Sequence, residues 1–345
     1  MHKSLNGYQR VRAALEGRFP DTRPVMLHNF MMAAREAGYT MAQFREDPQK
    51  IAASFIQAIE TYRYDGIVVD IDTATLAGAV GVSVTFPEDQ PARAHGQYLS
   101  RLEDAKRLSP VDISVYRYVQ NWLEAVRILK DYFGDEVCIR GNCDQAPFSL
   151  ASMMRTPELW MMDLLADEDN AFVLLEYCTD VTCQFIRLMA QTGCHMVSNG
   201  DSPAGPELIS PQMYRRFALP YERRVVEEAH KLGLLYALHI CGRTDAILSD
   251  MLETGADSLE LDYKTDVGKV FSLLKDRRCL IGNIDPSGIL AYGTTADVIR
   301  EIKRILDIYR SSPRLILNAG CAIPAETPSE NLKAMIATAR QSSFP

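Results

Sequence analysis

Short runs of apolar and β-branched residues alternate along the chain with longer segments in which apolar residues recur every three or four positions. A short run that is apolar at consecutive positions is typical of a strand buried on both faces, and the longer period is typical of an amphipathic helix. The pattern predicts eight strands: Pro24–Leu27, Gly66–Ile71, Glu136–Gly141, His195–Asn199, Leu234–Leu238, Ala256–Leu261, Cys279–Asn283 and Arg314–Asn318.

Helical segments lie between these strands, for example 51–59 and 296–306, and Thr294 or Thr295 is the expected N-cap of the latter. Eight strands that alternate with helices predict an α/β protein, a single (β/α)₈ TIM barrel.

Two segments fall outside the repeating pattern. Residues 1–20 form an amphipathic lead-in, which we expect to be an N-terminal helical extension. Residues 73–114, rich in Gly, Pro and charge, are expected to be an insertion after strand two that passes over one face of the barrel. No repeat or linker divides the chain, so residues 1–345 are expected to form one domain.

Composition narrows the functional classes. The net charge of −8 argues against a nucleic-acid surface, and no apolar stretch approaches the roughly 20 residues of a membrane span. The first residues lack the apolar segment of a signal peptide, so we expect a cytoplasmic location. The eight cysteines are then expected to be reduced thiols.

Polar and metal-binding side chains stand at the end of each predicted strand. In a TIM barrel the carboxyl ends of the strands carry the chemistry. The residues at these ends are His28, Asn29, Asp70, Asp72, Asn142, Asp201, His239, Cys241, Asp262, Asn283, Asp285, Asn318 and Cys321.

His239, Cys241 and Cys321 are the candidate metal ligands, on strands five and eight. One imidazole and two thiols favour Zn²⁺ and leave a coordination position open, as in catalytic zinc sites. Asp262 is the candidate fourth ligand; alternatively it accepts a hydrogen bond from His239. Glu260 competes with it but lies before the strand end.

The remaining strand-end residues are candidates for substrate contacts. Asp201, in Asn199-Gly200-Asp201-Ser202-Pro203, is a candidate catalytic residue that orients substrate or accepts a proton, although a simple turn followed by a Ser210 helix cap also explains the segment. A small polar substrate is expected to contact residues of this group, namely His28, Asn29, Asn142, Asn199, Asn283 and Asp285.

Taken together, these motifs resemble the uroporphyrinogen decarboxylase superfamily, and within it the branch of zinc-dependent methyltransferases that use methylcobalamin and coenzyme M. The resemblance rests on Gly200-Asp201-Ser202-Pro203, Ile209-Ser210-Pro211 through Leu219-Pro220-Tyr221, His239-Ile240-Cys241-Gly242, Thr254-Gly255-Ala256-Asp257, Gly282-Asn283-Ile284-Asp285-Pro286 and Gly320-Cys321-Ala322-Ile323-Pro324.

The resemblance implies a TIM barrel whose zinc is held by His239, Cys241 and Cys321, with Asp262 where relatives commonly have Glu. It implies methyl transfer between a corrinoid, such as methylcobalamin, and a thiol or another small acceptor or donor, in either direction. The chain contains no Asp-x-His-x-x-Gly corrinoid motif, so the corrinoid is expected on a separate corrinoid protein.

Two other functions stay open. Asp72 stands nine positions before Gly81, much as the catalytic aspartate of the decarboxylases precedes a glycine, which makes Asp72 a second candidate catalytic residue for a metal-free decarboxylase. However, residues 25–32 contain no arginine, whereas the decarboxylases use an arginine-rich motif there to bind a polycarboxylate. The third possibility is a non-catalytic barrel stabilised by zinc.

Overall fold

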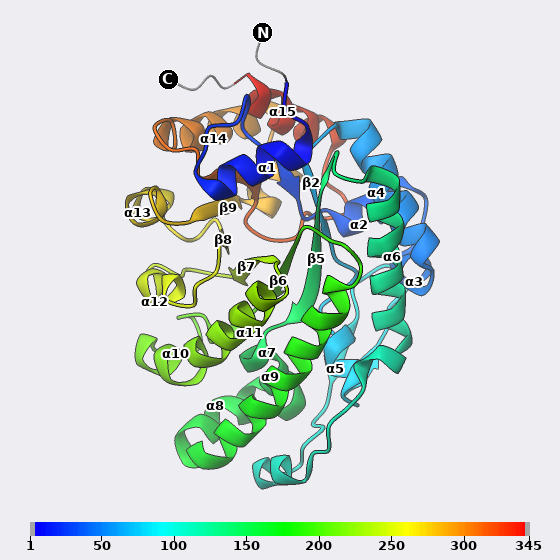
Figure 1. The fold of residues 1–345 in the computed structure, drawn as a ribbon, viewed down its shortest axis with the longest axis vertical. Helices are drawn as coiled ribbons and strands as arrows, with labels where there is room; N and C mark the ends of the chain where they lie inside the picture. Colours follow the sequence, from blue (N-terminus) through cyan, green and yellow to red (C-terminus); the bar gives the residue numbers. More distant parts are fainter. Residues whose placement is uncertain (1–3, 342–345) are drawn as a thin grey trace.

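In the computed structural model, eight parallel strands form a barrel surrounded by helices (Figure 1). The structure describes residues 4–341; the predictions for residues 1–3 and 342–345 lie outside this range. The strands follow one another around the barrel in chain order: β1 (Met26–Leu27), β2 (Gly66–Val69), β5 (Cys138–Gln145), β6 (Met196–Gly200), β7 (Leu235–Ile240), β8 (Ser258–Leu261), β9 (Cys279–Ile284) and β10 (Leu315–Ala319).

The first and last strands meet through a parallel bridge between Val25 and Leu317, where the Leu317 amide donates to the Pro24 carbonyl at 2.9 Å. The predicted TIM barrel is therefore confirmed, and each of the eight predicted strands overlaps an observed one. β5 differs most: it was predicted to end at Gly141 but continues to Gln145, past a register irregularity between Asn142 and Gln145. That extension places two further polar side chains at the end of this strand.

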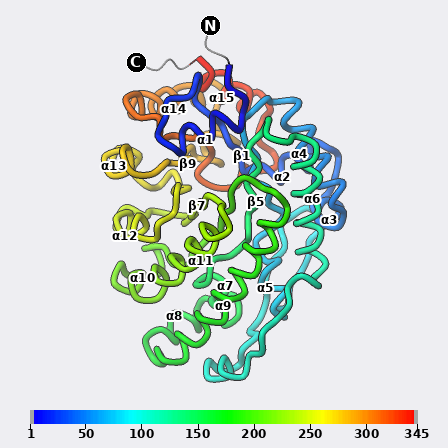
Figure 2. Tube along the Cα trace, viewed as in Figure 1, coloured from blue at the N-terminus to red at the C-terminus, as the bar shows by residue number. Residues whose placement is uncertain are grey.

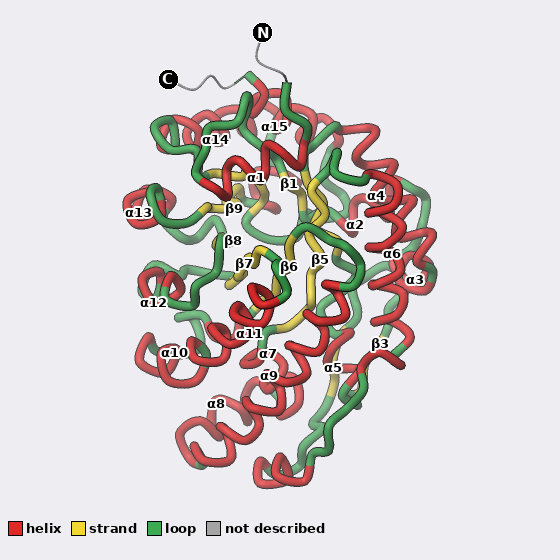
Figure 3. Tube along the Cα trace, viewed as in Figure 1, coloured by secondary structure: helices red, strands yellow, loops and turns green. Residues whose placement is uncertain are grey.

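Helices cover the outside of the barrel, as the secondary-structure colouring shows (Figure 3). They are α2 (Phe30–Glu36), α3 (Met41–Glu46), α4 (Pro48–Tyr62), α6 (Arg117–Phe133), α7 (Pro147–Arg155), α8 (Pro157–Ala166), α9 (Glu168–Ala190), α10 (Pro211–Phe217), α11 (Leu219–Lys231), α12 (Leu248–Leu252), α13 (Val267–Leu274), α14 (Thr295–Ile308) and α15 (Ser329–Arg340). Short 3₁₀ or π turns follow β6 and β9, at η3 (Ser202–Ala204) and η4 (Pro286–Ala291).

Sequence signals fix several of these helix ends. Thr294 begins α14 with a capping box in which its hydroxyl accepts from the Asp297 amide, as the sequence predicts. Ser210 caps α10 in the predicted way. No helix among the described residues is long and apolar enough to cross a membrane.

The N-terminal extension is helix α1 (Gly7–Glu16), which lies across the amino-terminal end of the barrel (Figure 1). Its Val11, Ala14 and Leu15 pack against inward-pointing strand residues such as Val68 and Met196, forming one buried apolar cluster. This cluster fills the amino-terminal part of the barrel interior.

The insertion after β2 contains α5 (Thr75–Ala79), the hairpin β3 (Ser83–Thr85) and β4 (Arg93–His95), and the 3₁₀ turns η1 (Leu102–Arg107) and η2 (Ile113–Val115). The trace runs along the flank of α6 toward the end of the barrel where α7, α8 and α9 lie (Figure 2). Thr73 and Pro91 from this segment line a cavity at the carboxyl ends of the strands.

Candidate metal centre and cavity

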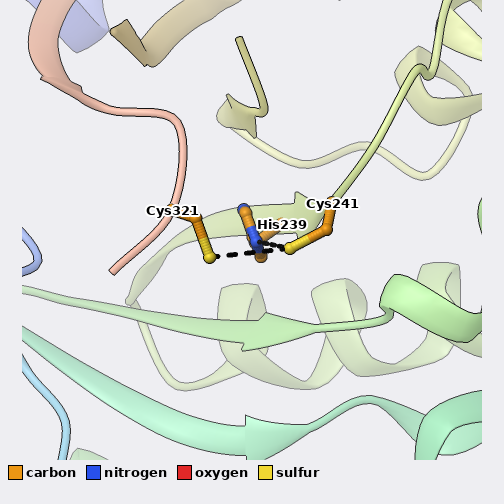
Figure 4. A group of neighbouring side chains, drawn as sticks. All are labelled: His239, Cys241 and Cys321. Atoms are coloured by element: carbon orange, nitrogen blue, oxygen red, sulfur yellow. Dashed lines mark hydrogen bonds between the residues drawn. The ribbon is translucent and has the colours of Figure 1, made fainter. Parts of the chain in front are cut away.

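His239, Cys241 and Cys321 lie together at the carboxyl end of the barrel (Figure 4). His239 is the penultimate residue of β7, Cys241 follows that strand, and Cys321 stands two residues beyond β10. Their ligand atoms all lie within 4.8 Å of one another. His239 Nε2 is 3.0 Å from Cys241 Sγ, which is 3.7 Å from Cys321 Sγ.

Two glycines allow this approach. Gly242, directly after Cys241, has a φ of 81°, in the left-handed region that favours glycine. Gly320 packs so closely on the loop after β8 that a Cβ atom at position 320 would lie 2.6 Å from the Tyr263 amide nitrogen. A larger residue at position 320 would therefore force the backbone on one side of this contact to shift.

The three side chains shift each other's protonation. The hydrogen bond from Cys321, together with His239, holds the pKa of the Cys241 thiol far below its usual range. Its partner Cys321 is shifted the other way: the same hydrogen bond raises the pKa of Cys321. Burial lowers the pKa of His239, but the neighbouring Cys241 thiolate outweighs it and raises the value to about 9. The cluster therefore favours at least one thiolate at neutral pH, the form that binds metal.

This donor set fits zinc. One nitrogen and two sulfurs within a few ångströms of each other match a catalytic zinc site with an open position. Soft sulfur donors disfavour Mg²⁺ and Ca²⁺.

A buried ion pair supports His239 from beneath. His239 Nδ1 lies 3.1 Å from the Glu260 carbonyl oxygen and 3.9 Å from a Glu260 carboxylate oxygen. That carboxylate accepts from Arg140, with which it forms a buried ion pair, and from Asn318 Nδ2 at 2.7 Å. Burial raises the pKa of Glu260, but Arg140 and the other nearby cations outweigh it and lower the value to about 2. Because the Glu260 carbonyl lies beside Nδ1, Nε2 is the ring nitrogen that faces the thiols.

Asp262, the predicted fourth ligand, stands outside the group of three ligand atoms. Its Oδ2 accepts from the Gly242 amide and its Oδ1 from the Lys264 amide, both at 3.0 Å. It therefore joins the loop after β7 to the loop after β8.

A cavity of about 220 Å³ adjoins the metal cluster. We call its metal-ligand side, formed by His239, Cys241 and Cys321, the sulfur wall. We call the side formed by Asp70, Asp72 and Asp144 the carboxylate wall. The strand ends of β2 and β5 supply the carboxylate wall, and those of β7 and β10 supply the sulfur wall.

Among the predicted substrate contacts and catalytic candidates, the structure brings three into the lining of the cavity: His28, Asp72 and Asn142. His28 Nε2 lies 2.7 Å from Asp70 Oδ2, and Asn142 Oδ1 accepts from Ser198. Sequence reasoning did not assign a role to Asp144, Gln145, Arg140 or Ser202, which also line the cavity.

The other predicted contacts do not line it. Asn29 faces Tyr64, and Asn199 donates to the Cys143 and Gln145 carbonyls. Asn283 donates to the Asp262 and Thr265 carbonyls, and Asp285 caps the turn at Ser287 and Gly288. All four hydrogen-bond to the scaffold of the barrel.

Asp201, a candidate catalytic residue, is completely buried and turned toward α7. Its Oδ1 accepts from the Ser149 amide at 2.7 Å and from the Ser149 hydroxyl at 2.6 Å. Burial raises the pKa of Asp201 to about 6, beside the equally buried Glu222. In this position its direct contacts are with the scaffold.

Fold and site together define a TIM-barrel protein with a candidate transition-metal centre at the catalytic end. Residues 7–342 match the family model of uroporphyrinogen decarboxylase (URO-D). The chain belongs to this family.

Its relatives fall into both branches that the sequence suggested. The chain is 32% identical to the methylcobamide:CoM methyltransferase MtbA of Methanosarcina acetivorans over 85% of each chain. It is 28% identical to the uroporphyrinogen decarboxylase of Nostoc punctiforme over 97% of this chain and 96% of the relative. A solved methyltransferase from Methanosarcina mazei shares the fold, with a TM-score of 0.88 at 24% identity over 97% of this chain and 98% of that one.

Proposed function

We propose that this protein is a zinc-dependent methyltransferase that moves a methyl group between a corrinoid, carried by a separate corrinoid protein, and a thiol or another small acceptor or donor. The observation that carries the proposal is the three-donor cluster of His239, Cys241 and Cys321 beside a cavity at the catalytic end of the barrel. The methyltransferases among the relatives support the same reaction class.

In this proposal His239, Cys241 and Cys321 hold the metal ion. When bound, zinc would act as a Lewis acid that lowers the pKa of a substrate thiol and presents a thiolate nucleophile. The Glu260 carbonyl keeps His239 oriented, and the buried Arg140–Glu260 pair holds Glu260 in place on β8. The cavity beside the cluster would receive the small substrate.

Asp262 remains our proposed fourth ligand for the substrate-free state. To reach the metal, its carboxylate would use a lone pair beyond those that accept from the Gly242 and Lys264 amides, or release one of these bonds.

The two alternatives have less support. A cavity of about 220 Å³ suits a ligand smaller than those of typical pockets, which span roughly 300–1,000 Å³, and is small for a porphyrinogen. A purely structural zinc site is usually closed by four protein ligands, whereas three donors gather here next to a cavity.

The test is metal content and thiol binding in purified, reduced protein. We expect one zinc per chain in the wild type and its loss in Cys241→Ala and Cys321→Ala, with Cys183→Ala, a helix cysteine, as the matched control. Cobalt-substituted wild type should change its absorption spectrum when a thiol is added. A wild-type protein that stays metal-free after reconstitution with zinc would contradict the proposal.

A further inference from the structure

The carboxylate wall places three carboxyl groups in a cavity that also contains the metal ligands. Asp70 and Asp72 come from the segment after β2, and Asp144 is the penultimate residue of β5. Each of these three side chains is at least 98% buried, because the exposed fractions are 2%, 0% and 2%.

Asp72 and Asp144 lie side by side. Asp72 Oδ1 accepts from the Thr75 amide at 2.9 Å, and Asp144 Oδ2 accepts from the next amide, Leu76, at 2.7 Å. Burial raises the pKa of Asp144 well above its ordinary value, and the charge of Asp72 raises it further. Two neighbouring buried carboxyl groups repel each other when both are ionised, unless a proton or another cation lies between them.

One oxygen of this pair has no partner. Asp72 Oδ1 accepts three hydrogen bonds, from Ala74, Thr75 and the Thr75 hydroxyl, whereas the buried Oδ2 accepts none. An unpaired buried carboxylate oxygen is costly, and Asp72 lines the cavity, so this oxygen points to a ligand that donates to it.

Among the described residues, no cation that lines the cavity forms an ion pair with Asp72 or Asp144. Arg140, the one arginine that lines the cavity among the described residues, has its charge matched by Glu260. Its Nε and Nη1 have no hydrogen-bond partner and remain available as donors. His28 bonds to Asp70. Arg45 approaches Asp72 but does not line the cavity, and it donates to the Pro87 and Gln90 carbonyls.

We propose, building on the proposed methyltransferase function, that the small-molecule substrate carries a cationic ammonium group, which Asp72 and Asp144 bind while its reacting atom faces the sulfur wall. A short aminothiol, or an amine with a methyl group to donate, has this chemistry. A thiol that ends in a sulfonate, such as coenzyme M, would place its negative charge against the carboxylate wall. The substrate class of this chain therefore differs from the CoM in the names of its methyltransferase relatives.

The test compares three thiols of similar size on cobalt-substituted protein: cysteamine, 2-mercaptoethanol and 2-mercaptoethanesulfonate. The dissociation constant of each is measured from the thiol-induced spectral change, in wild type, Asp72→Asn and Asp144→Asn. Because the thiols differ in their own acidity, the ratio of variant to wild type for each thiol is the readout. Glu222→Gln, which removes a buried carboxylate outside the cavity, is the matched control.

We expect Asp72→Asn to weaken cysteamine binding about tenfold, or about 1.4 kcal/mol, and to leave 2-mercaptoethanol within about twofold. The amide keeps an oxygen for the three donors to Oδ1, so this variant should fold; Asp144→Asn provides a second measurement. Equal effects of Asp72→Asn on the charged and neutral thiols, or a larger loss of affinity for the sulfonate than for cysteamine, would overturn the inference.

Failure of the methyltransferase proposal can be told apart from failure of the proposed ammonium site. If no thiol changes the cobalt spectrum, the proposed thiol activation is wrong, and calorimetric titration of the metal-free protein then tests the carboxylate wall alone. Binding of cysteamine that Asp72→Asn abolishes supports the ammonium site. Cysteamine binding that is absent, or equal in wild type and Asp72→Asn, overturns it.

Discussion

The two walls of the cavity handle buried charge in opposite ways. On the sulfur wall each charged group has a partner: Cys241 interacts with Cys321 and His239, and Glu260 beneath them pairs with Arg140 and Asn318. On the carboxylate wall Asp72 keeps an unpaired oxygen, and Asp144 adopts a left-handed backbone with a φ of 57°. Unpaired charge and backbone strain both cost stability and collect at functional sites. The sulfur wall is therefore organised before a ligand arrives, whereas a ligand completes the carboxylate wall.

The largest effect is expected from breaking the charge balance under the sulfur wall. Glu260→Gln leaves Arg140 buried without a countercharge, which should lower the free energy of unfolding by about 3 kcal/mol. Chemical denaturation of both proteins measures this. Glu207→Gln, which removes a half-exposed partner of Lys264, is the control and should change stability by less than about 1 kcal/mol. An equal loss in both variants would contradict the assignment.

A smaller effect separates a firm metal ligand from a proposed one. His239→Ala should reduce zinc affinity at least about 100-fold, or about 2.7 kcal/mol, because it removes one of three donors. Asp262→Asn should reduce it less than about tenfold, since backbone amides already hold both oxygens of Asp262. Competition with a chelator measures both affinities. A loss for Asp262→Asn as large as for His239→Ala would establish Asp262 as a full ligand.

The smallest effect has the opposite sign. Burial raises the pKa of Asp72 above its ordinary value of 3.8. A carboxyl group shifted in this direction contributes stability below its ordinary pKa, and the contribution is lost as the pH rises through the raised value. Asp72→Asn avoids that loss, so it should raise the free energy of unfolding by about 1 kcal/mol at pH 8 and by less at pH 5.

Thermal and chemical unfolding at the two pH values check this prediction. A variant that is less stable than the wild type at pH 8 would show that the carboxylate wall is as fully paired as the sulfur wall.

The fold could be predicted because each barrel strand is buried on both faces. All six residues of β9 are buried, for example, and this produces an apolar run that the sequence displays directly. The strand ends then placed His239, Cys241 and Cys321 at one end of the barrel, and the barrel brought them together.

The carboxylate wall was harder to predict, for two physical reasons. β5 was expected to end at Gly141, but an irregularity lets it continue, so Asp144 reaches the cavity from beyond the expected end. Arg140 and Glu260 lie within strands and pair across the barrel, and no local pattern reveals a partner 120 positions away. The sequence signal for Arg140 and for Glu260 is the same: each is a charged residue inside an otherwise apolar strand.

Polar residues at strand ends also proved to serve different purposes. Asn283 and Asp285 stand at the end of β9 as expected, yet they hydrogen-bond to loop backbone. Position along a strand predicts which end of the barrel a side chain occupies, whereas the direction in which it points depends on the loops that pack around it.

The 3.7 Å between Cys241 Sγ and Cys321 Sγ has a consequence for redox chemistry. Two thiols this close need only approach to about 2.05 Å to form a disulfide, giving two electrons and two protons to an oxidant such as dissolved oxygen. A bound metal ion would occupy both sulfurs and prevent that reaction. Metal-free protein that is exposed to air can therefore form this disulfide and lose its ability to bind metal. Its metal content should be measured in the presence of a strong reductant and in the absence of oxygen.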